Sequence, residues 1–315
     1  MPDQHYDLIG DIHGYADELV QLLQKLGYGL ADGCYRHPAR KVIFLGDFID
    51  RGPKQGEVLQ IVIPMVQQGS ALAVMGNHEF NALAFHTVSL ENPDRWLRPR
   101  TDKNIQQHVR FLDEYISHQD ELEAALEFFY ELPLWLDLDG LRVVHACWDI
   151  RHVRRLEAGG LLTSEGLMTP ELLVKASTPS APEYEAIEAL LKGVEYELPS
   201  GKFYIDKDGH ERRAARTQWW INEDCQLKDV VFPPAVLDSI GDDIGQIPIH
   251  GSDLVGYLPS EKPVFIGHYW LRGTPKRLAP NVICLDYSIA GGGKLVAYRW
   301  SGEQELSDDN FISAP

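Results

Sequence analysis

Three short motifs, each placed directly after an apolar run, constrain the fold of this chain more than any other feature of its sequence. They are Gly10-Asp11-Ile12-His13-Gly14, Gly46-Asp47-Phe48-Ile49-Asp50-Arg51-Gly52 and Gly76-Asn77-His78-Glu79. Each motif begins where a buried strand is expected to end, because the residues before it are β-branched or apolar. The motifs follow one another at intervals of roughly 30 to 36 residues, about the length of one βαβ unit. Right-handed crossovers would then bring all three loops to the same carboxyl-end edge of one sheet.

The segments between and after the motifs carry helix and strand patterns. Residues 17–27 place four leucines on one face and end in glycine, which predicts an amphipathic helix. Residues 104–132 contain neither glycine nor proline, and we expect two helices there, within a helical insertion that spans residues 86–132. Strand patterns return in four later segments, residues 141–145, 264–268, 282–286 and 295–299.

One long segment, residues 150–262, fits no simple connection. It is irregular and rich in proline, and it is too long to be a plain loop in a compact domain. We therefore expect it to form an inserted substructure or lid. The whole chain, residues 1–315, is predicted to be a single domain that carries this insertion and the helical one.

Composition excludes several classes of partner. The net charge is −18, from 47 acidic and 29 basic residues. Such a charge repels nucleic acid and anionic membranes at long range, although metal ions or local arginines can still bind an anionic substrate inside a cleft. The sequence has no apolar run of about 18 residues and no basic segment followed by an apolar one at its start. The four cysteines are widely spaced and include no C-x-x-C pair. Together with the missing membrane span and secretory signal, they predict a cytoplasmic location.

The motif side chains, together with two histidines at later strand ends, form a candidate metal-binding set. Asp11 and His13 alternate in one loop and can face one ion, while Asp47 can bridge two ions through its two oxygens. Mixed oxygen and nitrogen ligands suit Mn²⁺, Fe or Zn²⁺ better than a soft thiolate site would, and two divalent ions, with Mn²⁺ as the first candidate, are expected. Two such ions about 3.5–4 Å apart can clamp a phosphoryl group and deliver a hydroxide for in-line attack. The candidate ligands are Asp11, His13, Asp47, Asn77, His145 and His268.

The remaining polar residues of the motifs fit the same chemistry. His78 is next to a candidate ligand and can protonate a leaving oxygen as general acid. Asp50 is placed to orient that imidazole. Arg51 presents a planar fork suited to phosphate oxygens, and Asn77 is a further candidate for a phosphate contact.

The ordered set GDIHG, GDFIDRG and GNHE resembles the phosphoprotein phosphatase family of calcineurin-like metallophosphoesterases, including its bacterial diadenosine-tetraphosphatase branch. The resemblance implies a metallophosphoesterase fold, an α/β fold of the α+β sandwich type. A central β-sandwich would be flanked by helices and carry helical and irregular insertions. It also implies two metal sites, one formed by Asp11, His13 and Asp47, and the other by Asp47, Asn77, His145 and His268.

The same resemblance assigns the other roles. It makes His78 and Asp50 an acid pair and gives Arg51 a bond to substrate phosphate. Members of the family commonly use a second phosphate-binding arginine from the later half of the chain, and Arg216 is the first candidate, with Arg151 as the second.

We therefore predict a metal-dependent hydrolase acting on phosphate ester or anhydride bonds through a metal-bound hydroxide. The first substrate candidates are phosphoserine and phosphothreonine proteins and small phosphate esters. The alternative is a dinucleoside polyphosphate such as diadenosine tetraphosphate. A function of another class is an inactive phosphoprotein-binding module on the same fold. Its expected signature, loss of a ligand or of the acid, is absent from the sequence.

Overall fold

The computed structural model describes residues 5–89, 92–205, 209 and 211–314. The chain divides into two compact units, the first made of residues 1–191 and 262–315 and the second of residues 192–261. All three motifs lie in the first unit. The second unit falls inside the segment expected to be an insertion, whereas residues 150–191 belong to the first. The interpretation as one domain with two insertions stays a proposal.

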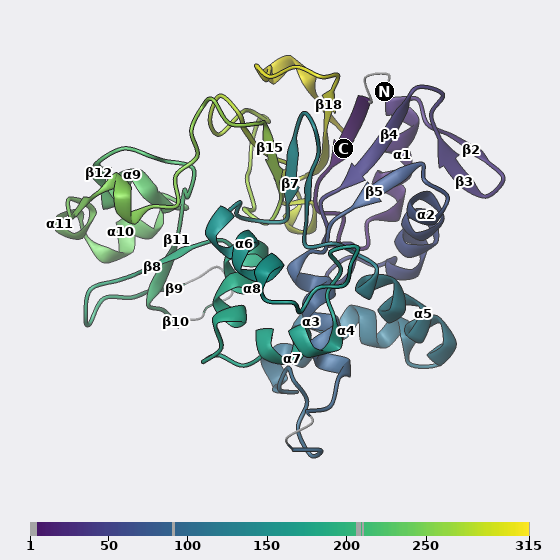
Figure 1. Ribbon diagram of the computed structural model, residues 1–315, viewed down its shortest axis with the longest axis horizontal. Coiled ribbons are helices and arrows are strands. Elements are labelled where there is room, and N and C mark those ends of the chain that lie inside the picture. Colours follow the sequence, from purple (N-terminus) through teal and green to yellow (C-terminus); the bar gives the residue numbers. More distant parts are fainter. Residues whose placement is uncertain (1–4, 90–91, 206–208, 210, 315) are drawn as a thin grey trace. The chain divides into compact units, whose positions relative to one another are not determined.

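The first sheet of unit 1 carries the three motifs. Its strand order is β17-β18-β1-β4-β5, with β19 paired to β18. Figure 1 labels β18, β4 and β5 of this sheet. β1, β4 and β5 are parallel, with Leu8 opposite Ile43 and Ile43 opposite Leu72. This confirms that the three loops leave the same edge of one sheet. The strands are β17 (Asp286–Tyr287), β18 (Lys294–Trp300), β1 (His5–Ile9), β4 (Arg40–Phe44), β5 (Ala71–Ala73) and β19 (Phe311–Ser313).

A second sheet of unit 1 supplies the two later histidines. Its order is β16-β15-β7-β6, and β15 runs parallel to both of its neighbours. One core cluster contains buried residues of both sheets, among them Leu8, Ile43, Val143 and Phe265. The two sheets therefore pack face to face as the expected β-sandwich. The strands are β6 (Trp135–Asp137), β7 (Arg142–Val144), β15 (Val264–Ile266) and β16 (Val282–Cys284).

Helices cover the first sheet and extend the edge that carries the motifs. α1 buries its leucine stripe and ends at Gly27, which adopts the left-handed conformation that glycine tolerates. It contacts β18 and α2, and α2 contacts β5. Two helices form over residues 102–130, as predicted. The helices are α1 (Ala16–Leu26), α2 (Gln55–Gln67), α3 (Asn77–His86), α4 (Asp102–Tyr115), α5 (Gln119–Tyr130), α6 (Ile150–Ala158), α7 (Pro170–Ala176) and α8 (Pro182–Lys192).

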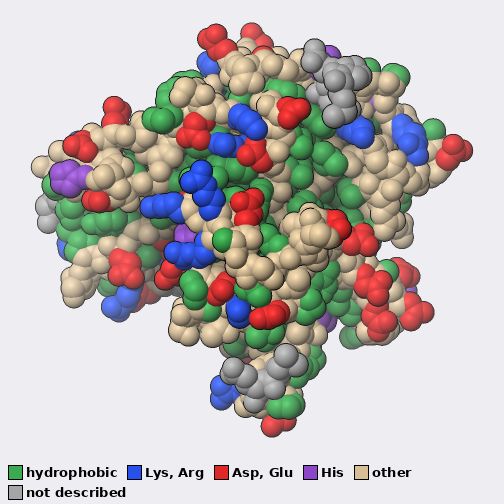
Figure 2. Space-filling model, in the orientation of Figure 1, with side chains coloured by type: hydrophobic (Ala, Val, Ile, Leu, Met, Phe, Trp, Pro, Cys, Tyr) green, Lys and Arg blue, Asp and Glu red, His purple; other side chains and the backbone are tan. Residues whose placement is uncertain are grey.

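Short elements complete the described part of unit 1. β2 (Gly29–Ala31) and β3 (Cys34–Arg36) form a hairpin, and the 3-10 helices are η2 (Ile289–Gly291) and η3 (Asp308–Asn310). On the face shown in Figure 2, basic side chains gather over α6, whose three arginines are exposed, and acidic side chains are scattered over the rest of the unit. Among the described residues, none of the helices combines the length and apolar character that crossing a bilayer requires.

The second unit has its own small core, which includes Ala215, Leu227 and Val231. A three-stranded sheet, β13-β11-β8, is its largest sheet. The strands are β8 (Glu195–Glu197), β9 (Tyr204–Ile205), β10 (Glu211–Arg212), β11 (Ala214–Thr217), β12 (Cys225–Gln226), β13 (Val231–Phe232) and β14 (Pro248–Ile249). The helices are α9 (Leu227–Val230), α10 (Val236–Ile240), α11 (Asp242–Gly245) and η1 (Gly251–Asp253).

A buried carboxylate ties three strands of the first sheet together. Asp7 on β1 is fully buried and accepts hydrogen bonds from Arg40 Nε at 3.0 Å and Arg299 Nε at 2.9 Å. The hydroxyl of Tyr28 donates to the same carboxylate at 3.1 Å. Breaking a buried ion pair from one side leaves the other charge without its partner, which costs about 3–5 kcal/mol.

We expect Asp7→Ala to lower the free energy of unfolding by about 3 kcal/mol or more, because it strands two guanidinium groups. Urea denaturation measures this change. Asp17→Ala is the matched control, since Asp17 is 66% exposed and pairs with Lys54 on the surface; its effect should stay below about 1 kcal/mol. Equal effects of the two substitutions would contradict the structural role of Asp7.

Candidate metal centre and active site

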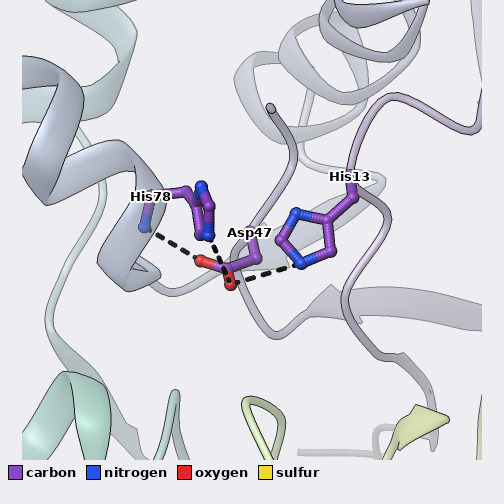
Figure 3. Close-up of side chains that lie close together, drawn as sticks. All are labelled: His13, Asp47 and His78. Atoms are coloured by element: carbon purple, nitrogen blue, oxygen red, sulfur yellow. Dashed lines mark hydrogen bonds and ion pairs between the residues drawn. The ribbon is translucent and has the colours of Figure 1, made fainter. Parts of the chain in front are cut away.

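The first and second motif loops are joined by backbone hydrogen bonds. The N–H groups of Ile12 and His13 both donate to the carbonyl of Asp47, at 3.0 and 2.8 Å. Gly14 N–H donates to Phe48 O at 2.8 Å. These bonds place the side chains of His13 and Asp47 against each other. Figure 3 shows the rings of His13 and His78 reaching the carboxylate of Asp47 from two different segments.

The second and third loops touch so closely that glycine is required at their contact. Gly46 has φ 89°, in the left-handed region. A side chain on Gly76 would collide with the carboxylate of Asp47. The backbone N–H of His78 donates to Asp47 Oδ1 at 3.0 Å from the start of α3. The second and third motifs therefore form one continuous surface around Asp47.

Backbone strain is concentrated in these loops. Eight described non-glycine residues have positive φ; five of them are candidate site residues, and a sixth, Trp270, packs against Arg51. A residue held in the left-handed region costs about 1–3 kcal/mol, so the surrounding hydrogen bonds must hold it there. The eight are His13, Asp32, Asp47, Asp50, Arg51, His268, Trp270 and Ser288.

Asp47 lies between two clusters of histidines, one facing each of its oxygens. Its Oδ2 is 3.6 Å from His13 Nε2 and 3.9 Å from His78 Nε2. Its Oδ1 is 3.4 Å from His145 Nε2. The ligand atoms of His13, Asp47 and His78 form one potential metal site within 4.8 Å of one another, and those of Asp47, His145 and His268 form a second. A carboxylate shared in this way is suited to bridge two ions.

The donors and acceptors at these atoms fit cations. His13 Nδ1 is 3.0 Å from the carbonyl of Ile49, so this nitrogen carries the proton and Nε2 keeps its lone pair. Burial, with His78 beside it, lowers the pKa of His13 to about 3, which keeps the ring neutral. His13 Nε2 is buried and has no hydrogen-bond partner among the described residues. The lone pair of His13 Nε2 faces Asp47 Oδ2 at 3.6 Å, and a positive charge between these two atoms would satisfy both.

The second cluster has the same arrangement. His145 Nδ1 lies 2.7 Å from the carbonyl of Leu45, which leaves Nε2 facing Asn77 Oδ1 at 3.1 Å and Asp47 Oδ1 at 3.4 Å. Burial opposes the charged form of His145, yet the Asp47 carboxylate outweighs it and raises the pKa of His145 to about 10. The cluster therefore attracts positive charge, and a divalent ion held by His145 Nε2, Asn77 Oδ1 and Asp47 Oδ1 would supply it in place of the proton.

Asp11 is adjacent to the second cluster. Its carboxylate is 2% exposed and accepts the backbone N–H of His268 at 3.1 Å. A side chain at Gly267 would collide with Asp11, so glycine is needed next to the last histidine. Burial and the nearby carboxyl of Asp286 raise the pKa of Asp11 well above its usual range. This crowding of buried carboxyls is relieved when cations are present. Its role as a ligand stays a prediction.

His78 and Asp50, which were predicted to act as an acid pair, are in contact, and their catalytic role stays a prediction. His78 Nδ1 lies 2.5 Å from Asp50 Oδ2, and both side chains are buried. His78 Nε2 also belongs to the first histidine cluster, which the sequence did not predict. Asp50 has a further partner, because its Oδ1 is 2.7 Å from His108 Nδ1 on α4. Burial works to raise the pKa of Asp50, but His108 and His78 outweigh it and hold that pKa well below its usual range.

The two arginines predicted to bind phosphate lie in different units. The guanidinium carbon of Arg51 is 4.5 Å from the ring centroid of Trp270, so the indole face supports the exposed fork beside the histidine clusters. Arg216 lies on β11 of the second unit. Its predicted contact with phosphate, like the roles of the other site residues, stays a prediction.

Sequence reasoning assigned no role to Glu79, although it is part of the third motif. Glu79 is fully buried at the start of α3, and its carboxylate accepts three backbone N–H groups. These are the N–H groups of Asp47 at 2.8 Å, Phe48 at 2.8 Å and Gly76 at 3.0 Å. Glu79 therefore holds the second loop against the third. A glutamate three residues after a helix N-cap is a known capping pattern, and this signal could have identified it.

We expect Glu79→Gln to weaken Mn²⁺ binding by about 10- to 100-fold, the usual cost of losing a residue that positions metal ligands. The amide would turn an N–H donor toward backbone N–H groups and so loosen Asp47. Calorimetric titration of metal-stripped protein measures this affinity. Glu57→Gln, an exposed change on α2, is the control. An unchanged affinity in Glu79→Gln would refute the positioning role.

The chain is similar to known proteins in sequence and in fold. The asymmetrical bis(5'-nucleosyl)-tetraphosphatase PrpE of Halalkalibacterium halodurans is 49% identical over 74 residues, 23% of this chain and 30% of that protein. The enzyme of the same name from Bacillus subtilis is 46% identical over 74 residues, with the same coverage. The match thus spans about 30% of the length of these relatives.

A solved structure extends the likeness in fold to the whole chain. A cold-active protein-tyrosine phosphatase of a psychrophilic Shewanella species matches with a TM-score of 0.50 and 17% identity. The match covers all of this chain and 83% of the other. Residues 5–158 also match the family model of the calcineurin-like phosphoesterases. These residues, just under half of the chain, carry the three motifs and His145 and are similar to the calcineurin-like phosphoesterases.

Proposed function

We propose that this chain is a dinuclear metal-dependent phosphoesterase that hydrolyses phosphate ester or phosphoanhydride bonds. The observation that carries the proposal is the position of Asp47, whose two oxygens face two separate histidine clusters. The candidate ligands are those predicted from the sequence, with Mn²⁺ as the first candidate ion and Fe or Zn²⁺ as alternatives. When bound, two divalent ions supply Lewis-acid charge for the phosphoryl oxygens and make a water molecule more acidic.

The side chains around the clusters have separate roles in this proposal. Arg51, held against Trp270, would bind the phosphoryl oxygens through its planar fork. His78 would give its proton to the leaving oxygen, and Asp50 would keep the imidazole in the productive orientation. Asn77 is near His145 and is a candidate for both a metal and a phosphate contact.

Two substrate classes follow from the site and the relatives. Phosphomonoesters, either phosphorylated proteins or small phosphate esters, need only the residues named above. Dinucleoside polyphosphates are the second candidate, because two relatives similar to this chain over 74 residues are named asymmetrical bis(5'-nucleosyl)-tetraphosphatases. An inactive phosphoprotein-binding module is less well supported, since the candidate ligands and the acid pair are all present in the chain.

The direct test is hydrolysis of p-nitrophenyl phosphate by metal-stripped protein before and after Mn²⁺ is restored. We expect turnover only with the metal, and we expect Asp47→Asn to lower kcat/KM at least ~100-fold, because one shared ligand serves both clusters. Metal-dependent turnover that is equal in wild type and Asp47→Asn would contradict the proposal. Asp17→Asn, a surface change in the first unit, is the matched control.

The role of His78 has its own test, because the need for a proton depends on the leaving group. Phenolate is a more basic leaving group than p-nitrophenolate, so its departure depends more on a general acid. We expect His78→Asn to slow hydrolysis of phenyl phosphate ~10-fold more than that of p-nitrophenyl phosphate. Steady-state kinetics on both esters measures the difference. An equal loss on both would point to a metal-binding role for His78 instead.

A further inference from the structure

A pocket of about 90 Å³ extends away from the proposed acid pair toward the helical segment after the third motif. Its near wall contains catalytic candidates, and its far wall contains residues that the proposed chemistry does not use. The near wall is formed by Asp50, Arg51, Asn77 and His78. The far wall is formed by Asn81, Phe85, Arg98, Gln107 and His108.

The cation of the far wall is Arg98. Its backbone N–H donates to the carbonyl of Ala84 at 2.9 Å, which fixes the residue beside α3. Its guanidinium donates to Gln107 Oε1 at 2.8 Å and to Asn104 Oδ1 at 3.3 Å. Both acceptors are neutral amide oxygens, so these bonds orient the group without cancelling its charge.

Asp50 is a carboxylate that lines the same pocket. Burial lowers the pKa of Arg98, and the negative charges of Asp50 and Glu188 partly offset this effect. Asp50, however, is already bonded on both of its oxygens, to His78 and to His108. Arg98 therefore remains the positive group that faces the pocket from the far wall.

His108 adds a second polar group to this wall. It is only 5% exposed, and its Nδ1 is fixed by Asp50 at 2.7 Å. Its Nε2 is buried and has no hydrogen-bond partner among the described residues. Because Nδ1 donates its proton to Asp50, Nε2 keeps its lone pair, so His108 shapes this wall while the contacts to an anion come from Arg98 and the amide of Gln107. The ring stacks on Phe111, with 4.8 Å between centroids, which limits its movement.

We propose that Arg98 and Gln107, on the wall that His108 completes, form a subsite for a leaving group that itself carries phosphate. The inference rests on the proposed phosphoesterase function. Because the pocket begins at His78, which protonates the leaving oxygen, it lies on the leaving-group side of the reaction. Two arginines, Arg51 and Arg98, line it in a chain whose net charge is −18. This favours an anionic leaving group, such as a nucleoside polyphosphate released from a phosphoanhydride.

The bonds in such a step balance without another reactant. The bond between the attacked phosphorus and the leaving oxygen breaks, and water supplies the new P–O bond. One proton of that water is released to solvent, while His78 gives its proton to the leaving oxygen and is later reprotonated from solvent. Arg98 and Gln107 bind the departing phosphate group and take no part in the proton transfer.

The test compares two substrates that differ in the charge of the leaving group. With Mn²⁺ restored, kcat/KM is measured for diadenosine tetraphosphate and for p-nitrophenyl phosphate. We expect Arg98→Gln to lower the ratio of the first to the second by ~10- to 100-fold, the usual effect of losing a charge-assisted hydrogen bond. Arg98→Lys should recover part of the ratio, since it keeps the charge and loses the fork. Arg110→Gln, an exposed change on α4, is the matched control.

Equilibrium titration of metal-free protein with ATP, a product of asymmetrical cleavage of diadenosine tetraphosphate, gives a second readout. Its Kd should rise in Arg98→Gln by a similar factor. Thermal melting checks that the variants are folded. If Arg98→Gln does not fold, Arg98→Lys takes its place, and a ratio of kcat/KM values equal to that of wild type would overturn the subsite.

The outcomes separate the inference from the function on which it rests. An unchanged ratio in Arg98→Gln, or a wild type that cleaves p-nitrophenyl phosphate and not diadenosine tetraphosphate, would overturn the subsite and leave the phosphoesterase standing. A folded wild type that cleaves neither substrate would overturn the proposed function and the subsite with it.

Discussion

The position of one buried carboxylate, Asp47, is the constraint on which the rest of the site depends. Its two oxygens face histidines from different parts of the chain, and its backbone accepts hydrogen bonds from the first motif loop. Its own N–H is bound by Glu79, which also binds the third loop. Left-handed backbone at Asp47 and close contact with Gly76 are tolerated because these bonds hold them in place.

The sandwich explains how residues so distant in sequence reach Asp47. Parallel strands β1, β4 and β5 deliver the three motif loops to one edge of the first sheet. β7 and β15 are parallel neighbours in the second sheet, so His145 and His268 follow strand ends at one edge as well. A shared apolar core fixes the two sheets against each other, and this brings the two edges together. Rigid strands thus provide the precision that a metal centre needs.

Much of this was visible in the sequence, because the information was local. Apolar runs followed by Gly-Asp or Gly-Asn predicted the strand ends, and the glycine-free stretch after residue 104 predicted two helices. The partnership of His108 with Asp50 was not predicted, since the two are 58 positions apart and α4 carries no motif. Arg98 was missed for the same reason: its pocket exists only once α3 and α4 are packed. Arg216 lies in a unit whose short strands and core give no local signal of a role in phosphate binding.

The central claim is that two ions share Asp47. Anomalous diffraction from a crystal grown with Mn²⁺ tests it most directly, because the signal locates the metals without assuming their ligands. The account predicts two anomalous peaks about 3.5–4 Å apart, one near each oxygen of Asp47, with His13 beside one ion and His145 and His268 beside the other. A single peak, or two peaks that do not share Asp47, would contradict it.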